Sequence, residues 1–369
     1  MRYLSPIDSH VHLRWEESKY IFNGMNFLQL GLRDAHAVGL AAMVEMPNTT
    51  PNLTSQKTIE ERIAHLDSNN SSDIYIGIYG GATNDADQIR EIAKLAKQSR
   101  KSYGRVKGLK IYFAHSTGNM GITEEEKQKV FWEQIKSAGF AGNVICHLED
   151  ECKYTGEFDY RNPASHSLRQ TPESELSQAE KQIRNAKDYG FTGTLISAHT
   201  SNPDTIDYLL KESKTGNLPF NIVTEMTLHH MLLNTDDYSV HGNGVKMNPP
   251  LRSREMQERN LEHVLKGNVT MIGTDHAPHD PSRKLDPSNK SPPSGIPGIL
   301  AWPLGIAVLK KHGIDREVLK RIIFGNANEI LFRGKLNPFE VEVKYNPELW
   351  AAYGYNPFSR IEQDLGLAD

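Results

Sequence analysis

Residues 8 to 14, Asp-Ser-His-Val-His-Leu-Arg, hold the side chains with the most chemical potential in this chain. If this stretch is a β-strand, the period-two alternation of side chains places four of them on one face: Asp8, His10, His12 and Arg14. Two imidazoles on one face can bind a single metal ion, and an arginine one step further can bind a carboxylate. We therefore predict a metal centre at the end of this strand, beside a site for an anionic group.

Possible metal ligands also lie within or at the ends of apolar runs elsewhere in the chain: Lys110, His147, His199 and Asp275. Imidazole nitrogens and carboxylate oxygens suit zinc and similar divalent ions. A lysine ammonium has no lone pair, so Lys110 fits a metal site only as a carbamate, whose two oxygens can bridge two metals. Asp275 could bind one metal and accept the proton of the hydroxide that the pair activates.

Each of these residues also has an ordinary structural interpretation. Lys110 could be an interior lysine in a salt bridge, Asp275 could cap a helix, and the two histidines could be hydrogen-bonded core residues. The metal interpretation is favoured because each of them belongs to a different apolar run, and the carboxyl ends of these runs would meet if the runs were parallel strands of one barrel.

The elements that must position these residues follow an alternating pattern. Eight short apolar runs are expected to be strands, at 6–12, 41–46, 73–80, 106–113, 143–148, 193–199, 220–226 and 269–275. Helices are expected between them, for example at 55–68, 85–100, 123–138 and 177–189, the last two with caps at Thr123 and Ser177. This alternation favours an α/β fold with a closed (β/α)8 barrel of the TIM type, and an open doubly wound sheet is the alternative.

Two irregular stretches, 151–176 and 276–301, follow the fifth and eighth runs and are expected to be lids or binding loops. Residues 1–333 are expected to form the barrel. Residues 334–369, which show no regular strand pattern, are expected to form an extension that packs on the barrel or on a neighbouring subunit.

Composition narrows the class of protein. The chain has 369 residues, of which 38% are hydrophobic, so a large core is possible. Its net charge of −4 and its interspersed charges argue against nucleic acid or a membrane surface as partners. The two cysteines, Cys146 and Cys152, do not form a disulfide framework, and no long apolar run is present. We therefore expect a soluble cytoplasmic protein.

Taken together, the motifs resemble those of the dihydroorotases of the amidohydrolase superfamily. They occur in the family's order over about residues 7–330: Asp-Ser-His-Val-His-Leu-Arg, Met-Pro-Asn-Thr-Thr-Pro, Gly-Leu-Lys-Ile-Tyr, His-Leu-Glu-Asp, His-Thr-Ser, Lys-Met-Asn-Pro-Pro-Leu-Arg and Thr-Asp-His-Ala-Pro-His. The resemblance implies two zinc ions per subunit, bridged by carboxylated Lys110. The implied ligands are His10, His12, Lys110 and Asp275 for the first metal, and Lys110, His147 and His199 for the second. The implied substrate-binding residues are Arg14, Asn48 and His279 for a free carboxylate, and Asn248 for a pyrimidine ring.

The reaction implied is the reversible, zinc-dependent cyclisation of N-carbamoyl-L-aspartate to L-dihydroorotate in de novo pyrimidine (UMP) biosynthesis. A metal-bridging hydroxide would attack the ring carbonyl, with Asp275 as general acid and base. One alternative is another cyclic amidase, such as an allantoinase, hydantoinase or dihydropyrimidinase, but Arg14 and His279 suit a substrate with a carboxylate. The other is an inactive scaffold, against which the complete ligand set argues. Only small-molecule partners and a homo-oligomer, dimer or tetramer, are expected.

The resemblance implies a barrel of the metal-dependent hydrolase kind. Longer members of the family also have a large β-sandwich domain, which is not expected here, and the chain departs from the family's pattern in other places as well. The family often has Arg-Glu-Pro-Gly where this chain has Arg14 followed by Trp-Glu-Glu-Ser, so a loop of different shape is expected there. Glu225 matches a family position of less certain role and could orient a metal ligand. The segment Ser-Gly-Ile-Pro-Gly at 294–298 resembles the family's loop next to the substrate.

Overall fold

The computed structural model describes residues 1–15, 20–102, 104–115, 120–215 and 217–367. The loop of different shape that is expected after Arg14 falls on residues 16–18, which lie outside the described residues. Among the described residues, no helix combines the length and the apolar character needed to cross a bilayer.

Each of the eight expected runs is a strand, and the eight strands form one parallel sheet in the order β2 to β9. Their bounds are β2 Ile7–Val11, β3 Ala42–Glu45, β4 Tyr75–Gly81, β5 Val106–Tyr112, β6 Asn143–His147, β7 Thr194–Ser197, β8 Asn221–Thr227 and β9 Met271–Gly273. The sheet closes where Val11 bridges His276 and the His12 amide donates to the His276 carbonyl at 2.7 Å. The closed barrel is confirmed, and the open sheet is excluded.

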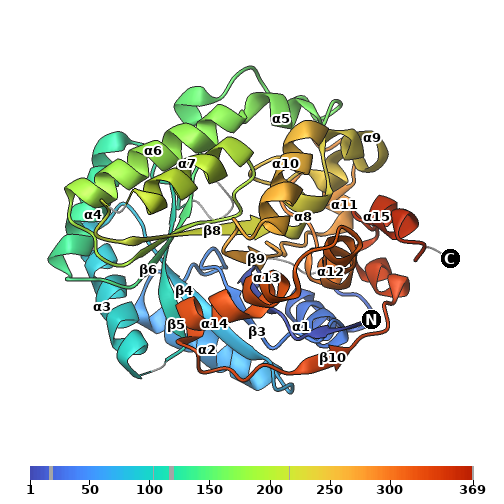
Figure 1. Ribbon diagram of the computed structural model, residues 1–369, viewed down its shortest axis with the longest axis horizontal. Coiled ribbons are helices and arrows are strands. Elements are labelled where there is room, and N and C mark those ends of the chain that lie inside the picture. The colour runs from blue at the N-terminus through green and yellow to red at the C-terminus, as the bar shows by residue number, and fades with distance from the viewer. Residues whose placement is uncertain (16–19, 103, 116–119, 216, 368–369) are drawn as a thin grey trace.

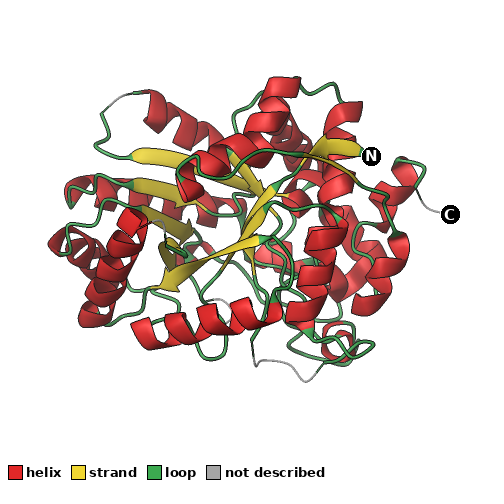
Figure 2. Ribbon diagram, turned by 90° about the horizontal axis from the view of Figure 1, so that it is seen from below, coloured by secondary structure: helices red, strands yellow, loops and turns green. Residues whose placement is uncertain are grey.

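Helices surround the barrel, with the strands enclosed between them (Figures 1 and 2). The helices are α1 Phe27–Ala37, α2 Gln56–Asn69, α3 Ala86–Ser102, α4 Glu125–Ser137, α5 Ser165–Arg169, α6 Pro172–Asp188, α7 Pro203–Lys214, α8 Leu228–Leu232, α9 Tyr238–His241, α10 Arg254–Leu265, α11 Pro281–Lys284, α12 Trp302–Lys311, α13 Arg316–Lys320, α14 Asn326–Phe332 and α15 Ser359–Asp364. Shorter 3-10 turns include η1 Glu151–Lys153, η4 Ile299–Ala301 and η6 Pro347–Tyr353.

Two of the expected helix starts are wrong. The residue before α4 is Glu124, not Thr123, and its side chain makes no capping hydrogen bond. Helix α6 begins at Pro172, because proline has the right φ for a first helical turn and loses no hydrogen bond there. Ser177 therefore lies inside α6, and its hydroxyl donates to Asp150 Oδ2 at 2.8 Å.

The C-terminal tail contains a strand that the sequence pattern does not predict. β10, Glu340–Glu342, pairs antiparallel with β1, Arg2–Leu4, so the start of the C-terminal tail lies beside the N-terminal strand (Figure 1). Further along the tail, the Tyr353 hydroxyl donates to the buried Asp34 Oδ2 of α1 at 2.6 Å. A strand of three residues is too short to show a period-two pattern.

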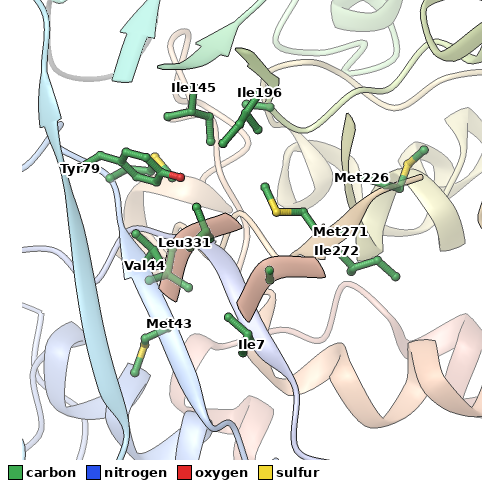
Figure 3. Packing of buried hydrophobic residues seen from close by; sticks show 14 of the residues in the cluster. Ile7, Met43, Val44, Tyr79, Ile145, Ile196, Met226, Met271, Ile272 and Leu331 are labelled. Carbon is green, nitrogen blue, oxygen red and sulfur yellow. The ribbon is translucent and has the colours of Figure 1, made fainter. Parts of the chain in front are cut away.

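The barrel interior has an apolar base below its polar end. Figure 3 shows Val44, Ile145, Ile196 and Met271, from four strands, gathered with Leu331 of α14. All five side chains are buried, and each contributes roughly 1.5–3 kcal/mol on burial. Period two then places the residues at the carboxyl ends of the same strands over this base, as it does for His147 after Ile145.

Candidate active site

One pocket at the carboxyl ends of the strands collects most of the predicted site residues. It is lined by His10, His12, Arg14, Asn48, Tyr112, His147, His199, Asn248, Asp275, Ala277, Ser294 and Gly295. Lys110 lies just behind this lining, fully buried, with its amino group 4.9 Å from the Tyr112 ring centre. His279 also lies behind it and contacts Arg14, with 3.0 Å between His279 Nε2 and Arg14 Nη2.

The first group of possible ligands consists of His10, His12 and Asp275. One donor atom from each lies within 4.8 Å of the others, and all three residues are buried. His12 Nε2 is 2.9 Å from Asp275 Oδ1, and His10 Nε2 is 3.4 Å from the same oxygen. Two imidazoles and a carboxylate are a donor set that zinc prefers.

The second group consists of His147 and His199. Nδ1 of His147 faces Nε2 of His199 at 3.0 Å, and the two rings are 4.7 Å apart. His199 also lies near the first group, with 5.3 Å between its ring centre and that of His10. The two groups therefore border one space, as two neighbouring cations would require.

In three of the histidines, one ring nitrogen is hydrogen-bonded to an oxygen atom, and the second nitrogen is left to bind a metal ion. His10 Nδ1 donates to Glu225 Oε1 at 2.7 Å, His12 Nδ1 donates to Asn48 Oδ1 at 2.6 Å, and His147 Nε2 donates to Glu149 Oε2 at 2.8 Å. Contacts of this kind fix the tautomer of a metal-binding histidine and make it a better ligand. Each ring then directs a lone pair into the pocket.

The position of the proton on His12 indicates whether these residues fit a metal ion. Burial lowers the pKa of His12 to about 4, so the ring is neutral and its single proton serves Asn48. The lone pair on His12 Nε2 thus faces a carboxylate oxygen of Asp275 at 2.9 Å. Two lone pairs at this distance repel each other unless a cation lies between them, so the donor set fits a bound metal ion.

Asp275 is held in its charged form. Burial by itself favours the neutral acid, but the neighbouring imidazoles of His10 and His12 outweigh it and keep the pKa of Asp275 below its usual range. A carboxylate that is ionised at neutral pH can act both as a ligand and as a proton acceptor.

Lys110 has the environment expected for a modified lysine. Its Nζ is buried and has no hydrogen-bond partner among the described residues, and no carboxylate of that part of the chain forms an ion pair with it. Burial lowers the pKa of Lys110 to about 8, which increases the share of neutral amine, the form that reacts with carbon dioxide. The alternative of an interior salt bridge therefore has no support in the described structure.

Three pocket residues stand at strand ends with an unusual backbone. The φ angles of Arg14, His199 and Asp275 are +54°, +35° and +47°, in the left-handed region. For residues other than glycine this region is unfavourable, by on the order of 1 kcal/mol or more, and it is found mainly where function requires it. These residues follow the ends of β2, β7 and β9, and two of them, His199 and Asp275, belong to the ligand groups.

Two loop residues belong to this region: Asn248 lines the pocket, and His279 lies behind the lining next to Arg14. His279 Nε2 donates to the Ser294 carbonyl at 2.8 Å, and burial next to Arg14 lowers the pKa of His279 well below its usual value. His166 Nε2 lies 2.8 Å from Asn248 Oδ1 and orients that amide. The sequence analysis missed His166, because nothing in the sequence around it indicates that α5 reaches the pocket.

Two further site residues were not predicted, although the sequence pattern indicates them. Tyr112 lines the pocket two residues after Lys110, and Glu149 holds His147 from two residues further along the chain. The period-two rule that singles out Lys110 and His147 indicates both of them as well. Glu225, given only a possible orienting role, also receives the Ser9 hydroxyl at 2.6 Å and the His199 amide at 3.2 Å.

The expected position of Asp8 is wrong. Asp8 does not line the pocket, and its carboxylate instead accepts hydrogen bonds from the Thr274 amide at 2.9 Å and the Trp302 indole at 3.1 Å. The pairing of β2 with β3 shifts between Asp8 and Val11, so strict alternation fails along this strand. Asp8 joins β2 to β9 and is not part of the ligand set.

Fold and site together define a class. An eight-stranded parallel barrel with imidazoles, carboxylates and a lysine gathered at its strand ends is a TIM-type barrel with a candidate metal centre at the end where such barrels carry their active sites. No family model matches the chain. The chain is 29% identical over 327 residues to the dihydroorotase of Halobacterium salinarum, covering 88% of this chain and 70% of that protein. It is 28% identical over 366 residues to the dihydroorotase of Methanosarcina mazei, covering 93% of this chain and 73% of that protein.

Among solved structures, the L-hydantoinase (dihydropyrimidinase) from Arthrobacter aurescens is similar with a TM-score of 0.74 and 20% identity, covering 90% of this chain and 71% of that one. This likeness shows the shared barrel fold alone. The sequence comparisons go further, and the chain is a homologue of the dihydroorotases.

Proposed function

We propose that this protein is a dihydroorotase, which interconverts N-carbamoyl-L-aspartate and L-dihydroorotate in de novo pyrimidine biosynthesis. The observation that carries the proposal is the pairing of two unlike groups in one pocket. A set of metal-binding donors lies beside Arg14, whose Nη2 is 3.0 Å from His279 Nε2. A cyclic amide that carries a carboxylate matches both groups at once.

We propose two zinc ions per subunit as the cofactor. The proposed ligands are His10, His12 and Asp275 for one ion and His147 and His199 for the other, with carboxylated Lys110 between the two. Support comes from the opposed lone pairs of His12 and Asp275 and from the unpartnered amino group of Lys110. When bound, the metal ions would supply the Lewis acidity that activates a water molecule and polarises the reacting carbonyl.

The residues of the chain have the remaining tasks. In ring opening, Asp275 accepts a proton from the attacking water and delivers it to the ring nitrogen that leaves, and in ring closure it does the reverse. Arg14, Asn48 and His279 bind the substrate's free carboxylate, and Asn248 contacts the ring. Asn48 Oδ1 is bonded to His12, so the amide nitrogen is the end of this side chain suited to a carboxylate.

A second candidate is another cyclic amidase, of the hydantoinase or dihydropyrimidinase type, since a structure of that name shares the barrel. The buried arginine beside the ligand group argues against it, because a hydantoin or dihydrouracil ring has no carboxylate to match that positive charge.

Steady-state assays with purified, zinc-loaded protein separate these candidates. We expect kcat/KM for dihydroorotate to exceed that for dihydrouracil, hydantoin and allantoin by about 10²-fold or more, because a site built to bind a polar group discriminates strongly against analogues that lack it. Removal of the metal with a chelator should abolish turnover, and zinc should restore it. A preference for hydantoin or dihydrouracil would replace the proposal by the second candidate, and no turnover of any of them would favour an inactive scaffold.

We further propose that the protein acts in the cytoplasm as a homo-oligomer, with residues 334–369 as an extension of the 1–333 barrel. Support for a reducing compartment comes from the two cysteines, which are both free thiols although Cys152 is exposed. The contact of Tyr353 with Asp34 supports docking of the extension on its own barrel. Light scattering of the purified protein measures the oligomeric state.

A further inference from the structure

Two lysines, Lys246 and Lys284, lie next to the loops that border the pocket. Neither has a role in the proposed reaction. Lys284 ends α11 and is fully buried, with an exposed fraction of 0%. Lys246 is half-buried and precedes Met247 and Asn248, which lies in the pocket. Within the described part of the chain, the amino groups of both lysines bind uncharged oxygens and form no ion pair.

The contacts of these lysines fasten two pocket segments together. Lys284 Nζ donates to the carbonyls of Lys246 at 2.6 Å and Pro293 at 2.8 Å. Lys246 Nζ donates to Ser294 Oγ at 2.6 Å, and the Gly295 amide returns a hydrogen bond to the Lys246 carbonyl at 2.9 Å. The segment that carries Asn248 is thus fixed to the loop at 292–295.

This loop in turn places the groups proposed to bind the carboxylate. The Ser294 carbonyl accepts from His279 Nε2 at 2.8 Å, and Arg14 Nη2 lies 3.0 Å from the same nitrogen. Gly295 has a φ of +132°, and a Cβ there would come within 2.5 Å of the Ala277 carbonyl oxygen and 3.0 Å of His279 Nε2. A loop packed this closely transmits any displacement to His279.

The choice of lysine indicates a role beyond packing. Burying an ammonium group without an anion is unfavourable, and a well-packed apolar side chain of similar volume often gives equal or greater stability. Burial lowers the pKa of Lys246 to about 8 and that of Lys284 well below its usual value, in each case with nearby cations adding to the effect. An anionic substrate would bring negative charge into this cationic region.

We propose that Lys284 and Lys246 are positioning residues for substrate recognition, which hold the 292–295 loop so that His279 and Arg14 meet the substrate's carboxylate. The inference rests on the proposed function for the identity of the substrate. The joining of the two segments itself rests only on the contacts given above.

Lys284→Met and Lys246→Met test this role, with Lys290→Met as the matched control, because Lys290 is an exposed lysine of the same loop region. We expect each test variant to raise KM for dihydroorotate by about tenfold, and to weaken binding of the analogue orotate equally, as for a lost charge-assisted contact. The values of kcat and metal content should stay within about threefold of wild type, as for loss of a binding contact alone. Hydrogen exchange in a peptide covering 292–297 should become faster.

The control should match wild type in every measurement. An unchanged KM and orotate affinity in both test variants would overturn the proposal, and so would equal losses for dihydroorotate and dihydrouracil or a loss of metal, which would indicate general disorder of the site. If Lys284→Met does not fold, Lys246→Met and Ser294→Ala carry the same test.

Failure of the proposed function would look different. Wild-type protein would then neither turn over dihydroorotate nor bind orotate, while the exchange measurement would still report whether the lysines fix the loop. A wild-type enzyme that is active on dihydroorotate, with variants that keep its KM, would leave the function intact and remove the lysines from it.

Discussion

The two walls of the pocket are built in different ways. The metal-facing wall uses strand ends, and its histidines are backed by buried oxygen acceptors such as Glu225 and Glu149. The opposite wall uses loops for the most part, and its polar groups are backed by other nitrogen donors, among them His166 and Lys284. One wall concentrates negative charge for cations, and the other concentrates positive charge for an anion.

This division orients a substrate before any chemistry occurs. A molecule with a carboxylate at one end and a reactive amide at the other has only one favourable orientation between the walls. The difference also predicts separable effects. Changes to the strand wall should reduce metal content and turnover, and changes to the loop wall should reduce substrate affinity alone.

The largest expected effect is at the centre of the strand wall. Lys110→Ala should lower kcat/KM by about 10³-fold or more and remove most of the bound metal, because the bridge between the two metals is lost. Lys107→Met is the matched control, since Lys107 lies on the same strand but away from the pocket. Elemental analysis and the dihydroorotate assay on one preparation give both quantities. A Lys110→Ala protein that keeps its metal and activity would rule out the bridging role.

Asp275→Asn should follow in size, with a fall in kcat of about 10²-fold or more, because the amide cannot carry the proton. The variant should fold, since Asn tolerates the left-handed φ of +47° at this position better than most residues do. Activity should be measured at saturating zinc, so that weaker metal binding is not mistaken for slow chemistry. Near-native turnover would exclude Asp275 as the proton carrier.

The comparison of the two walls also separates what the sequence reveals from what it does not. The strand wall follows from local pattern, because an apolar run predicts a strand and period two predicts which of its residues share a face. This pattern predicts that His147 and Asp275 belong to the site, and the structure brings them into one pocket. Asp8 fails the same rule, because the shifted pairing of β2 depends on its neighbour and not on its own sequence.

The contacts of the loop wall, and the pairing of the N-terminal strand with the C-terminal tail, could not be predicted from the sequence. Lys284 and His166 contact the segments beside the pocket only because of how the loops fold there, and no periodicity describes such a path. The pairing of β1 with β10 joins residues more than three hundred positions apart, for example Arg2 with Glu342, and neither strand is long enough to be recognised by itself. Tertiary contacts determine these features.

Glu225→Ala tests whether the hydrogen-bond partners of the metal-binding histidines contribute to metal affinity, and a smaller effect is expected. Without this carboxylate His10 Nδ1 loses its 2.7 Å partner, and metal affinity should fall by about 10–100-fold, as for other residues that orient a ligand. Glu149→Ala, which removes the partner of His147, is the counterpart on the second ligand group. Metal titration of both variants should show weaker binding with unchanged KM at saturating metal. A higher KM with normal metal affinity would contradict the assignment of Glu225 to the strand wall.

The smallest effect is expected on the loop side, where it is also the most specific. Arg14→Met should raise KM for dihydroorotate about tenfold or more, about 1.4 kcal/mol, the scale of a lost charge-assisted hydrogen bond. Arg14 is a cleaner probe than Asn48, whose oxygen is bonded to the ligand His12 at 2.6 Å. Metal content and kcat should therefore stay near wild type. Dihydrouracil lacks the carboxylate, so its kcat/KM should change little, and the preference for dihydroorotate should shrink by the full tenfold.

An exposed arginine replaced in the same way, Arg254→Met, controls for the loss of charge. If Arg14→Met keeps the preference, Arg14 does not bind the carboxylate, and the division between a cation-binding wall and an anion-binding wall fails at its most direct point.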